Sequence, residues 1–289
     1  DQMEKVSVVI AAYNRPDFLR KALESVIKQT VPAFEIIVVD DYSKIDLQPV
    51  INCFSEQNII YIKKAENKGV SHSRNVGIKM ATGDWISFLD DDDEYLPTRI
   101  ESNLNDTSKA NVSAVLCSYK TLETGYVEKV IESKILEPID LKERAVLCGT
   151  TGLFAKSNIL RKELFDESLT LGEDWDIFIR LMNHGNVYYN SEPLYLYRKG
   201  HESITTNAKK LKISEAHRYC LSSIKHREWL GEYNFKLRVA KVYLSYIWLK
   251  DNKIGWIYEC IRVAGFPTTF KVLVNGMLKK ILNSEKNTH

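Results

Sequence analysis

The sequence predicts an α/β fold with a mainly parallel central sheet, followed by a C-terminal region that is almost entirely helical. In the first 100 residues, short runs rich in Val and Ile alternate with segments whose apolar residues recur at helical spacing. This order places a helix between successive parallel strands. After about residue 205 the helical spacing continues, with breaks expected near Gly231, Asn252 and Gly265.

Four early strands are expected, each short and apolar, as in strands buried on both faces. They cover residues 5–12, 34–39, 58–62 and 85–89. Pro16 can open a helix between the first two, and another helix is expected over 71–80.

The pattern is mixed from residue 100 to about 205. We expect strands near 113–119, 152–155 and 187–189, and a helix that begins near Glu173. The expected division is therefore a catalytic α/β domain over 1–205 and a basic helical region over 206–289.

Composition indicates a soluble globular protein: 289 residues, 44% hydrophobic and 27% charged. Its longest uncharged stretch, residues 145–155, is shorter than the roughly 20 residues of a membrane span. The first residues lack the features of a signal peptide. Five widely spaced cysteines with no CxxC pair favour free thiols in a reducing cytosol. We therefore expect a cytoplasmic protein.

The net charge of +2 conceals an asymmetry between the two regions. Residues 205–289 carry 16 Lys and Arg against 6 Asp and Glu, whereas residues 1–204 carry 24 against 32. A basic tail favours an anionic partner, and the alternative is a solvated helical surface with surplus lysine.

Polar clusters follow three of the four early strands, at 13–15, 40–41 and 90–93. Each alone could be a turn. Ligands of open α/β sheets bind beyond the carboxyl ends of the strands, so three clusters at one edge predict a site.

The four adjacent carboxylates Asp90 to Asp93 are the most informative cluster. They repel one another, and a divalent cation completed by substrate phosphates would relieve that repulsion. The sequence has no GxxxxGK[ST] motif, no HExxH motif and no GxGxxG after a strand. It therefore does not support a P-loop nucleotidase, a zinc peptidase or a dinucleotide oxidoreductase.

A second acidic cluster, 172–176, stands at a helix start. One interpretation is charge that complements the helix dipole. The other is that Asp174 acts as general base for a hydroxyl nucleophile, beside Trp175, which could stack on a sugar. The cations Arg74, Arg198 and His201 could hold a diphosphate, or be ordinary surface charges.

Taken in order, these segments resemble the family 2 glycosyltransferases, which have the GT-A fold. The similar segments, all within residues 5–205, are 6–14, 36–43, 67–78, 82–97, 172–176 and 197–203. The resemblance implies an inverting transferase that uses Mn²⁺ or Mg²⁺ to move a hexose from a UDP-sugar to a saccharide hydroxyl.

The resemblance also implies roles for individual residues. The nucleotide-sugar site would consist of Ala11, Tyr13, Asp41, Asn67, Arg74, Asp90, Asp91, Arg198 and His201. Within the DxD element, Asp92 and Asp90 would hold the metal and Asp91 would lie near the ribose. Asp174 would be the base, with Glu173 and Trp175 on the acceptor side. The family usually has a small residue where Asp91 stands, so the choice of metal ligands within 90–93 stays open.

The acceptor favoured by the resemblance is a lipid-linked oligosaccharide of bacterial O-antigen, capsule or lipopolysaccharide synthesis, and no nucleic acid is expected as partner. Two alternatives are a catalytically inactive sugar-binding module and a nucleotidyltransferase. The first predicts a degraded DxD element or a missing base. The second predicts a glycine-rich loop after the first strand, where residues 11–14 contain no glycine.

The last expectation concerns residues 265–282. At helical spacing, one apolar stripe flanked by lysines is formed by Phe270, Leu273, Val274, Met277, Leu278, Ile281 and Leu282. Such a stripe is typical of a helix lying in a membrane interface, here the inner face of the plasma membrane. It is also typical of a helix packed on the body or against a second copy in a homodimer.

Overall fold

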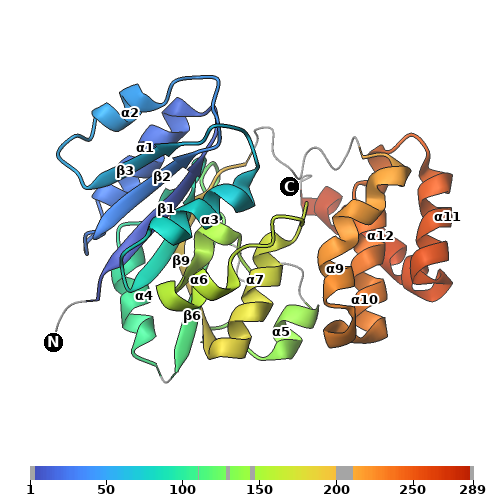
Figure 1. The fold of residues 1–289 in the computed structure, drawn as a ribbon. Coiled ribbons are helices and arrows are strands. Elements are labelled where there is room, and N and C mark those ends of the chain that lie inside the picture. The colour runs from blue at the N-terminus through green and yellow to red at the C-terminus, as the bar shows by residue number, and fades with distance from the viewer. Residues whose placement is uncertain (1–3, 110, 128–130, 144–146, 200–210, 287–289) are drawn as a thin grey trace. The chain divides into compact units, whose positions relative to one another are not determined.

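The computed structural model describes residues 4–109, 111–127, 131–143, 147–199 and 211–286. The chain divides into two compact units. The first comprises Asp1–Glu167 and Glu173–Gly200, and the second comprises Ser168–Gly172 and His201–His289. In Figure 1 the sheet belongs to the first unit, and the orange and red helices belong to the second.

The first unit is built on a nine-stranded sheet with the order β3-β2-β1-β4-β8-β6-β9-β5, in which β7 also pairs with β9. The strands are β1 (Val6–Ala12), β2 (Glu35–Asp40), β3 (Ile59–Lys63), β4 (Trp85–Asp90), β5 (Glu94–Tyr95), β6 (Val112–Thr121), β7 (Lys134–Ile135), β8 (Leu153–Lys156) and β9 (Asn186–Tyr197). The first four strands are parallel, and β6 is parallel to β9. The predicted α/β fold with a mainly parallel sheet is confirmed.

The helices of the first unit connect these strands (Figure 1). They are α1 (Pro16–Ile27), α2 (Gln48–Asn52), α3 (Val70–Met80), α4 (Arg99–Thr107), α5 (Pro138–Glu143), α6 (Ser157–Glu163) and α7 (Glu173–Leu181), with short 3₁₀ turns η1 (Thr150–Gly152) and η2 (Met182–His184). Helix α3 packs on β1 and β2. Its Gly77 permits this close approach, because a Cβ there would clash with Cγ1 of Val9.

The expected early strands agree with the structure to within about two residues, because continuous apolar runs mark them clearly. Strand β9 is much longer than the expected 187–189. Its ladder with β6 shifts register near Pro193, so the sequence there loses the alternation by which a strand is recognised. The two-residue strands β5 and β7 leave no such pattern.

The second unit is helical in its described part. Its elements are η4 (Ile213–Cys220), α9 (Leu221–Lys225), α10 (Arg227–Tyr243), η5 (Ile247–Leu249), α11 (Lys253–Ala264) and α12 (Phe266–Lys286). All three expected breaks occur. Gly231 has a positive φ of 74° within α10, Asn252 caps α11, and Gly265 ends α11 with a φ of 81°.

The apolar stripe expected on α12 is divided in the structure. Leu273 and Val274 are half-buried, whereas Phe270, Met277 and Leu278 are exposed. The side chains of Ile281 and Leu282 lie outside the described residues. No helix within the described ranges is long and apolar enough to cross a membrane. All five cysteines are free thiols, as expected.

Candidate active site

Three adjacent strands end in polar residues at one edge of the sheet. Strand β1 lies between β2 and β4, and Ala12 pairs in register with Asp40 while Ala11 pairs with Asp90. Since the three strands are parallel, the residues that follow them leave the sheet at the same edge. The structure therefore brings the three polar clusters of the sequence together.

The carboxylate of Asp41 lies at the end of β2 and is enclosed by donors. Oδ1 accepts hydrogen bonds from Nζ of Lys64 at 2.6 Å and the backbone N–H of Lys68 at 2.9 Å. Oδ2 accepts one from the N–H of Gly69 at 2.9 Å. Asn67 donates to the carbonyl of Asp41. A carboxylate has about four acceptor sites, so three donors orient Asp41 without exhausting it.

Asp91 joins the acidic run to the loop after β1. It is buried, and its Oδ2 accepts a hydrogen bond from the N–H of Tyr13 at 2.9 Å. The guanidinium of Arg15 contacts both Asp91, at 3.2 Å, and Asp92, at 2.9 Å. Burial raises the pKa of Asp91 to about 7 against the lowering effect of these two donors. Asp91 therefore ties two strand ends together.

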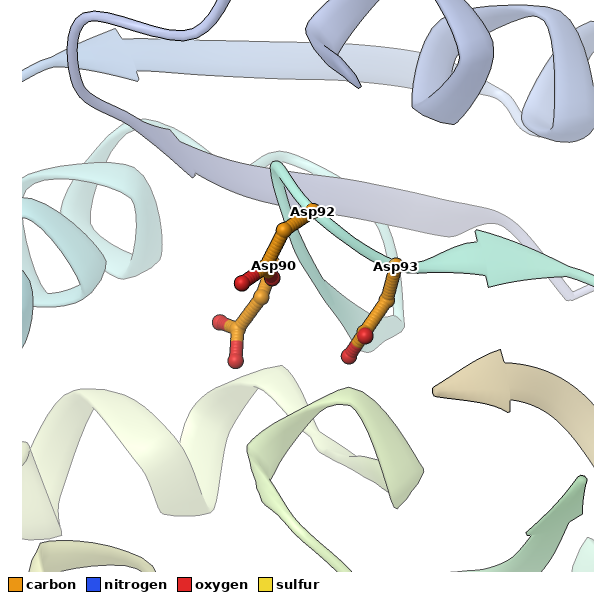
Figure 2. Close-up of side chains that lie close together, drawn as sticks. All are labelled: Asp90, Asp92 and Asp93. Carbon is orange, nitrogen blue, oxygen red and sulfur yellow. The ribbon is translucent and has the colours of Figure 1, made fainter. Parts of the chain in front are cut away.

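Three of the four adjacent carboxylates form a potential metal site. One oxygen each from Asp90, Asp92 and Asp93 lie within 4.8 Å of one another. Figure 2 shows the three side chains projecting from the turn after β4. Asp93 is buried and accepts a hydrogen bond from Thr151 at 2.7 Å. Burial, together with the negative charges of Asp90 and Asp92, raises the pKa of Asp93 well above its usual range. Clustered carboxylate oxygens suit a hard divalent cation.

Arg74 connects this cluster to the start of α7. Its guanidinium is 2.8 Å from Oδ1 of Asp90 and 3.3 Å from Oε1 of Glu173. Only 5% of the Arg74 side chain is exposed, and its guanidinium lies 5.3 Å from the ring centre of Phe165. The two acidic clusters, whose residues Asp90 and Glu173 are 83 positions apart in sequence, therefore share one buried cation.

Asp174 lies in the first turn of α7 beside this bridge. Burial raises its pKa to about 7, and the negative charge of Glu173 adds to the rise. Asp90 and Arg74 also act on it electrostatically, in opposite directions. A carboxylate with a pKa near neutrality suits a general base, since it can exist unprotonated and still accept a proton readily.

The expectation that Trp175 stacks on a sugar is wrong for this structure. The Trp175 side chain is buried, with 3% exposed, and its Nε1–H donates to the carbonyl of Leu141 at 2.8 Å. At the third position of α7 the Trp175 side chain turns toward α5 and the core. Its neighbour Glu173 instead faces Arg74.

Arg198 reaches the acidic run from the end of β9. Its Nε donates to the carbonyl of Asp92 at 3.0 Å, and Nη2 pairs with Glu94 at 3.0 Å. Its guanidinium also lies 4.3 Å from the ring centre of Phe18. In this structure Arg198 thus stabilises the turn after β4. His201 lies outside the described residues.

The sequence analysis gave no individual role to Arg15, Lys64 or Thr151, all of which contact the site, and left Asp93 among the open candidates for a metal ligand. Arg15 and Asp93 lie within the polar clusters at 13–15 and 90–93, so their positions in the sequence are a usable signal. Lys64 and Thr151 belong to other segments and reach the site only through the sheet topology, so no local pattern identifies them.

The sequence profile described as "Glycosyl transferase family 2" matches residues 7–169. The chain therefore belongs to this family of transferases. It is 31% identical over 212 residues to an uncharacterized glycosyltransferase of Rickettsia typhi, a match that covers 70% of this chain and 66% of that protein. The chain thus spans slightly less than two thirds of this relative.

Two further comparisons concern proteins with more specific names. Over 149 residues the chain is 37% identical to the Escherichia coli UDP-Glc:alpha-D-GlcNAc-diphosphoundecaprenol beta-1,3-glucosyltransferase WfaP, covering 50% of this chain and 56% of WfaP. The fold of the present chain is similar to that of Staphylococcus aureus TarS 1–349 in complex with UDP-GlcNAc. The TM-score is 0.65 at 16% identity, with 90% of both chains covered.

The mannosyltransferase PcManGT from Pyrobaculum calidifontis in complex with GDP-Man and Mn²⁺ is also similar. Its TM-score is 0.62 at 15% identity, with coverage of 95% of this chain and 80% of that one. Both structural likenesses support the GT-A fold.

Proposed function

We propose that the protein is an inverting, metal-dependent glycosyltransferase that moves a hexose from a UDP-sugar to a hydroxyl of a saccharide acceptor. The observation that carries this proposal is the Arg74 bridge between Asp90 and Glu173. It joins the acidic run, where a nucleotide diphosphate would bind, to the helix start that carries Asp174. Donor and base therefore belong to one site.

The proposed catalytic domain covers residues 1–205, and residues 206–289 form the helical region. Every described residue assigned here to the reaction, including Asp41, Asp92, Asp174 and Arg198, belongs to the first compact unit. The second unit also includes the segment Ser168–Gly172, directly before α7.

In this proposal Asp41 accepts a hydrogen bond from the nucleotide base, and the backbone from Ala11 to Tyr13 lines the same pocket. The donors Lys64, Lys68 and Gly69 already orient the carboxylate. A base with an N–H in its ring, as uracil has, can use the remaining acceptor capacity. Asn67 holds this loop through the Asp41 carbonyl, and Asp91 keeps the ribose side of the pocket in place through Tyr13.

Asp90 and Asp92 are the proposed metal ligands, and the structure adds Asp93 as a third carboxylate within reach. The three clustered carboxylates fit a divalent cation, because oxygen ligands of this charge are those that Mn²⁺ and Mg²⁺ prefer. When bound, the metal would supply positive charge that neutralises the diphosphate leaving group. Arg198, together with His201, would add further positive charge there.

Asp174 is the proposed base. Its carboxylate would accept the proton of the acceptor hydroxyl while that oxygen forms a bond to the anomeric carbon. The bond from this carbon to the diphosphate breaks on the opposite face, so the configuration inverts. Glu173 would hold the acceptor side and, through Arg74, keep α7 in position.

The relatives support a lipid-linked acceptor in polysaccharide synthesis. The name of WfaP describes transfer of glucose from UDP-Glc to a sugar on diphosphoundecaprenol, and another similar protein is a putative colanic acid biosynthesis glycosyl transferase of E. coli. We extend both properties to this chain: a UDP-hexose as donor and a lipid-linked oligosaccharide as acceptor.

A lipid-linked acceptor implies work at a membrane surface, and the second unit supports this. Large apolar side chains are exposed on it, including Ile254, Tyr258, Phe266 and Phe270, in a region of net charge +10. Lysines near anionic lipid attract the surface, and exposed aromatic side chains can enter it. We therefore place the protein in the cytoplasm, peripheral to the inner face of the plasma membrane.

The direct test is a screen of UDP-sugars for release of free UDP, first without acceptor and then with a GlcNAc-diphospholipid. Release should require Mn²⁺ or Mg²⁺ and stop in excess EDTA. Asp92→Ala should lower metal affinity by more than the roughly 10- to 100-fold typical of outer-sphere changes, measured by Mn²⁺ titration. The inactive-module alternative predicts UDP binding without turnover, and a nucleotidyltransferase would release pyrophosphate. Undiminished turnover in EDTA would contradict the metal requirement.

A further inference from the structure

The second unit contains an apolar pocket that the proposed reaction does not use. Its volume is about 130 Å³, and it opens between α10, η5 and α12. It is lined by Lys241, Leu244, Ile247, Trp248, Val272, Leu273 and Gly276. Leu244 and Ile247 are buried, and Trp248 remains 42% exposed. The pocket thus has an apolar floor, an aromatic ring and a single charged side chain.

Gly276 is an exposed residue and lines this pocket without a side chain. It lies inside α12, where glycine is less favourable than alanine, and its φ is not positive. A Cβ built on Gly276 would meet no heavy atom of the described residues within 4 Å. Neither backbone conformation nor close packing therefore calls for glycine.

We propose that this pocket binds a segment of the polyprenyl chain of the lipid-linked acceptor, with Lys241 toward its anionic diphosphate. The proposal rests on the proposed function, which supplies the lipid-linked acceptor. The volume of the pocket is close to the roughly 150 Å³ of an apolar cavity that takes up benzene, so a branched unit of five carbons is a suitable occupant.

The lining favours a hydrocarbon over water, because a bound water needs two to four polar partners. Lysine at the pocket and the net charge of +10 of residues 205–289 complement a chain that ends in phosphates. A neutral hydrocarbon would gain no electrostatic attraction from this charge.

The test is calorimetric titration of the full chain with farnesyl diphosphate, in EDTA so that metal cannot hold the diphosphate at the acidic run. The wild-type chain should bind saturably. Gly276→Leu fills the pocket and should weaken binding about tenfold or more. Asn275→Leu, the adjacent exposed position on the same helix, is the matched control and should bind like wild type. Circular dichroism checks that both variants are folded.

Lys241→Gln is a second variant, which keeps the test decisive if Gly276→Leu does not fold, and it should weaken binding several-fold. Equal affinity in wild type and the folded variants, or no saturable binding by wild type, overturns the proposal. The proposal is also overturned if dodecyl phosphate binds as tightly as farnesyl diphosphate. That result would indicate that the pocket takes a linear lipid chain rather than a branched one. Dimerisation that Gly276→Leu abolishes in sedimentation velocity overturns it in favour of a second copy.

Titration of the same protein with UDP, in buffer that contains Mn²⁺ and no EDTA, separates the two proposals. If UDP binds and farnesyl diphosphate does not, the pocket assignment fails and the transferase proposal stands. If only farnesyl diphosphate binds, the transferase proposal fails instead.

Discussion

The two units differ in how much charge they bury and in how much apolar side-chain surface they expose. The first unit buries charge: Asp41, Arg74, Asp91 and Asp93 are each at most 6% exposed and each contacts opposite charge or hydrogen-bond donors. The second unit exposes large apolar side chains, such as Ile254 at 83% and others on α11 and α12.

Both arrangements cost folding free energy, for different physical reasons. A buried charge loses its hydration, and only well-placed partners compensate for the loss. An exposed apolar surface keeps its unfavourable contact with water until something covers it. The comparison therefore supports the proposed chemistry of the first unit and the proposed docking role of the second. Each of the following experiments tests whether the two units have these different roles.

The largest effect is expected for Asp174→Asn. Loss of a general base typically costs about 10²- to 10⁴-fold in rate, so kcat should fall by this factor. UDP affinity should stay nearly unchanged, because Asp174 lies at α7 rather than at the nucleotide strand ends. Steady-state kinetics and calorimetry measure the two quantities on one sample. A variant that keeps more than about half of the activity would exclude Asp174 as the base.

The pH dependence tests the same carboxylate. The pKa of Asp174 is raised to about 7, and the base must be ionised to accept a proton. The rate should therefore rise about tenfold per pH unit up to pH 7 and level off above it. A rate that is flat from pH 5 to 8 would contradict this assignment.

Stability should change in the opposite direction with pH. Because the folded state holds the Asp174 proton above the ordinary pKa, it binds more protons than the unfolded state between about pH 4 and 7. The free energy of unfolding should therefore fall as the pH rises from about 4 to 7. Asp174→Asn, which cannot ionise, should show a smaller fall in thermal melts from pH 4 to 8.

The variant Lys64→Met tests whether the buried Asp41 carboxylate depends on its ion pair with Lys64. Removing one partner of a buried ion pair typically costs about 3–5 kcal/mol, and here it leaves Asp41 without its 2.6 Å neighbour. Urea unfolding should show a loss of this size, accompanied by weaker UDP binding. The matched control is Lys63→Met, at an exposed neighbouring position. Equal stability of the two variants would show that the ion pair is dispensable.

The smallest effect is expected at the surface of the second unit. Phe266 and Phe270 stack with ring centres 6.0 Å apart and are 64% and 58% exposed. Replacing both by Ser should lower partitioning onto anionic vesicles about tenfold, because partial insertion of each ring contributes well below the about 1.5–3 kcal/mol of complete burial. The matched control replaces Met80 and Ile139, exposed on the first unit. If the control lowers binding equally, the docking role of the second unit is wrong.

Local sequence determined much of this protein by itself. Apolar runs marked β1, β2 and β4, because strands buried on both faces leave a continuous signal. Gly231, Asn252 and Gly265 marked the helix breaks, because positive φ and capping are properties of single residues. The acidic run indicated a possible cation site, because adjacent carboxylates repel one another, and the structure brings three of them within 4.8 Å. It also places Arg15 and Arg74 beside the run, and these cations relieve part of the repulsion.

Only the tertiary structure decided which residues meet. Lys64 pairs with Asp41 because β3 lies beside β2, and Arg74 joins Asp90 to Glu173 because α3 and α7 approach the same sheet edge. Trp175 turned into the core although its neighbours suggested a sugar platform. Local pattern reports the conformation of a segment. Pairing, burial and the resulting pKa of Asp174 depend on charges and atoms brought together from distant segments, so no local pattern contains them.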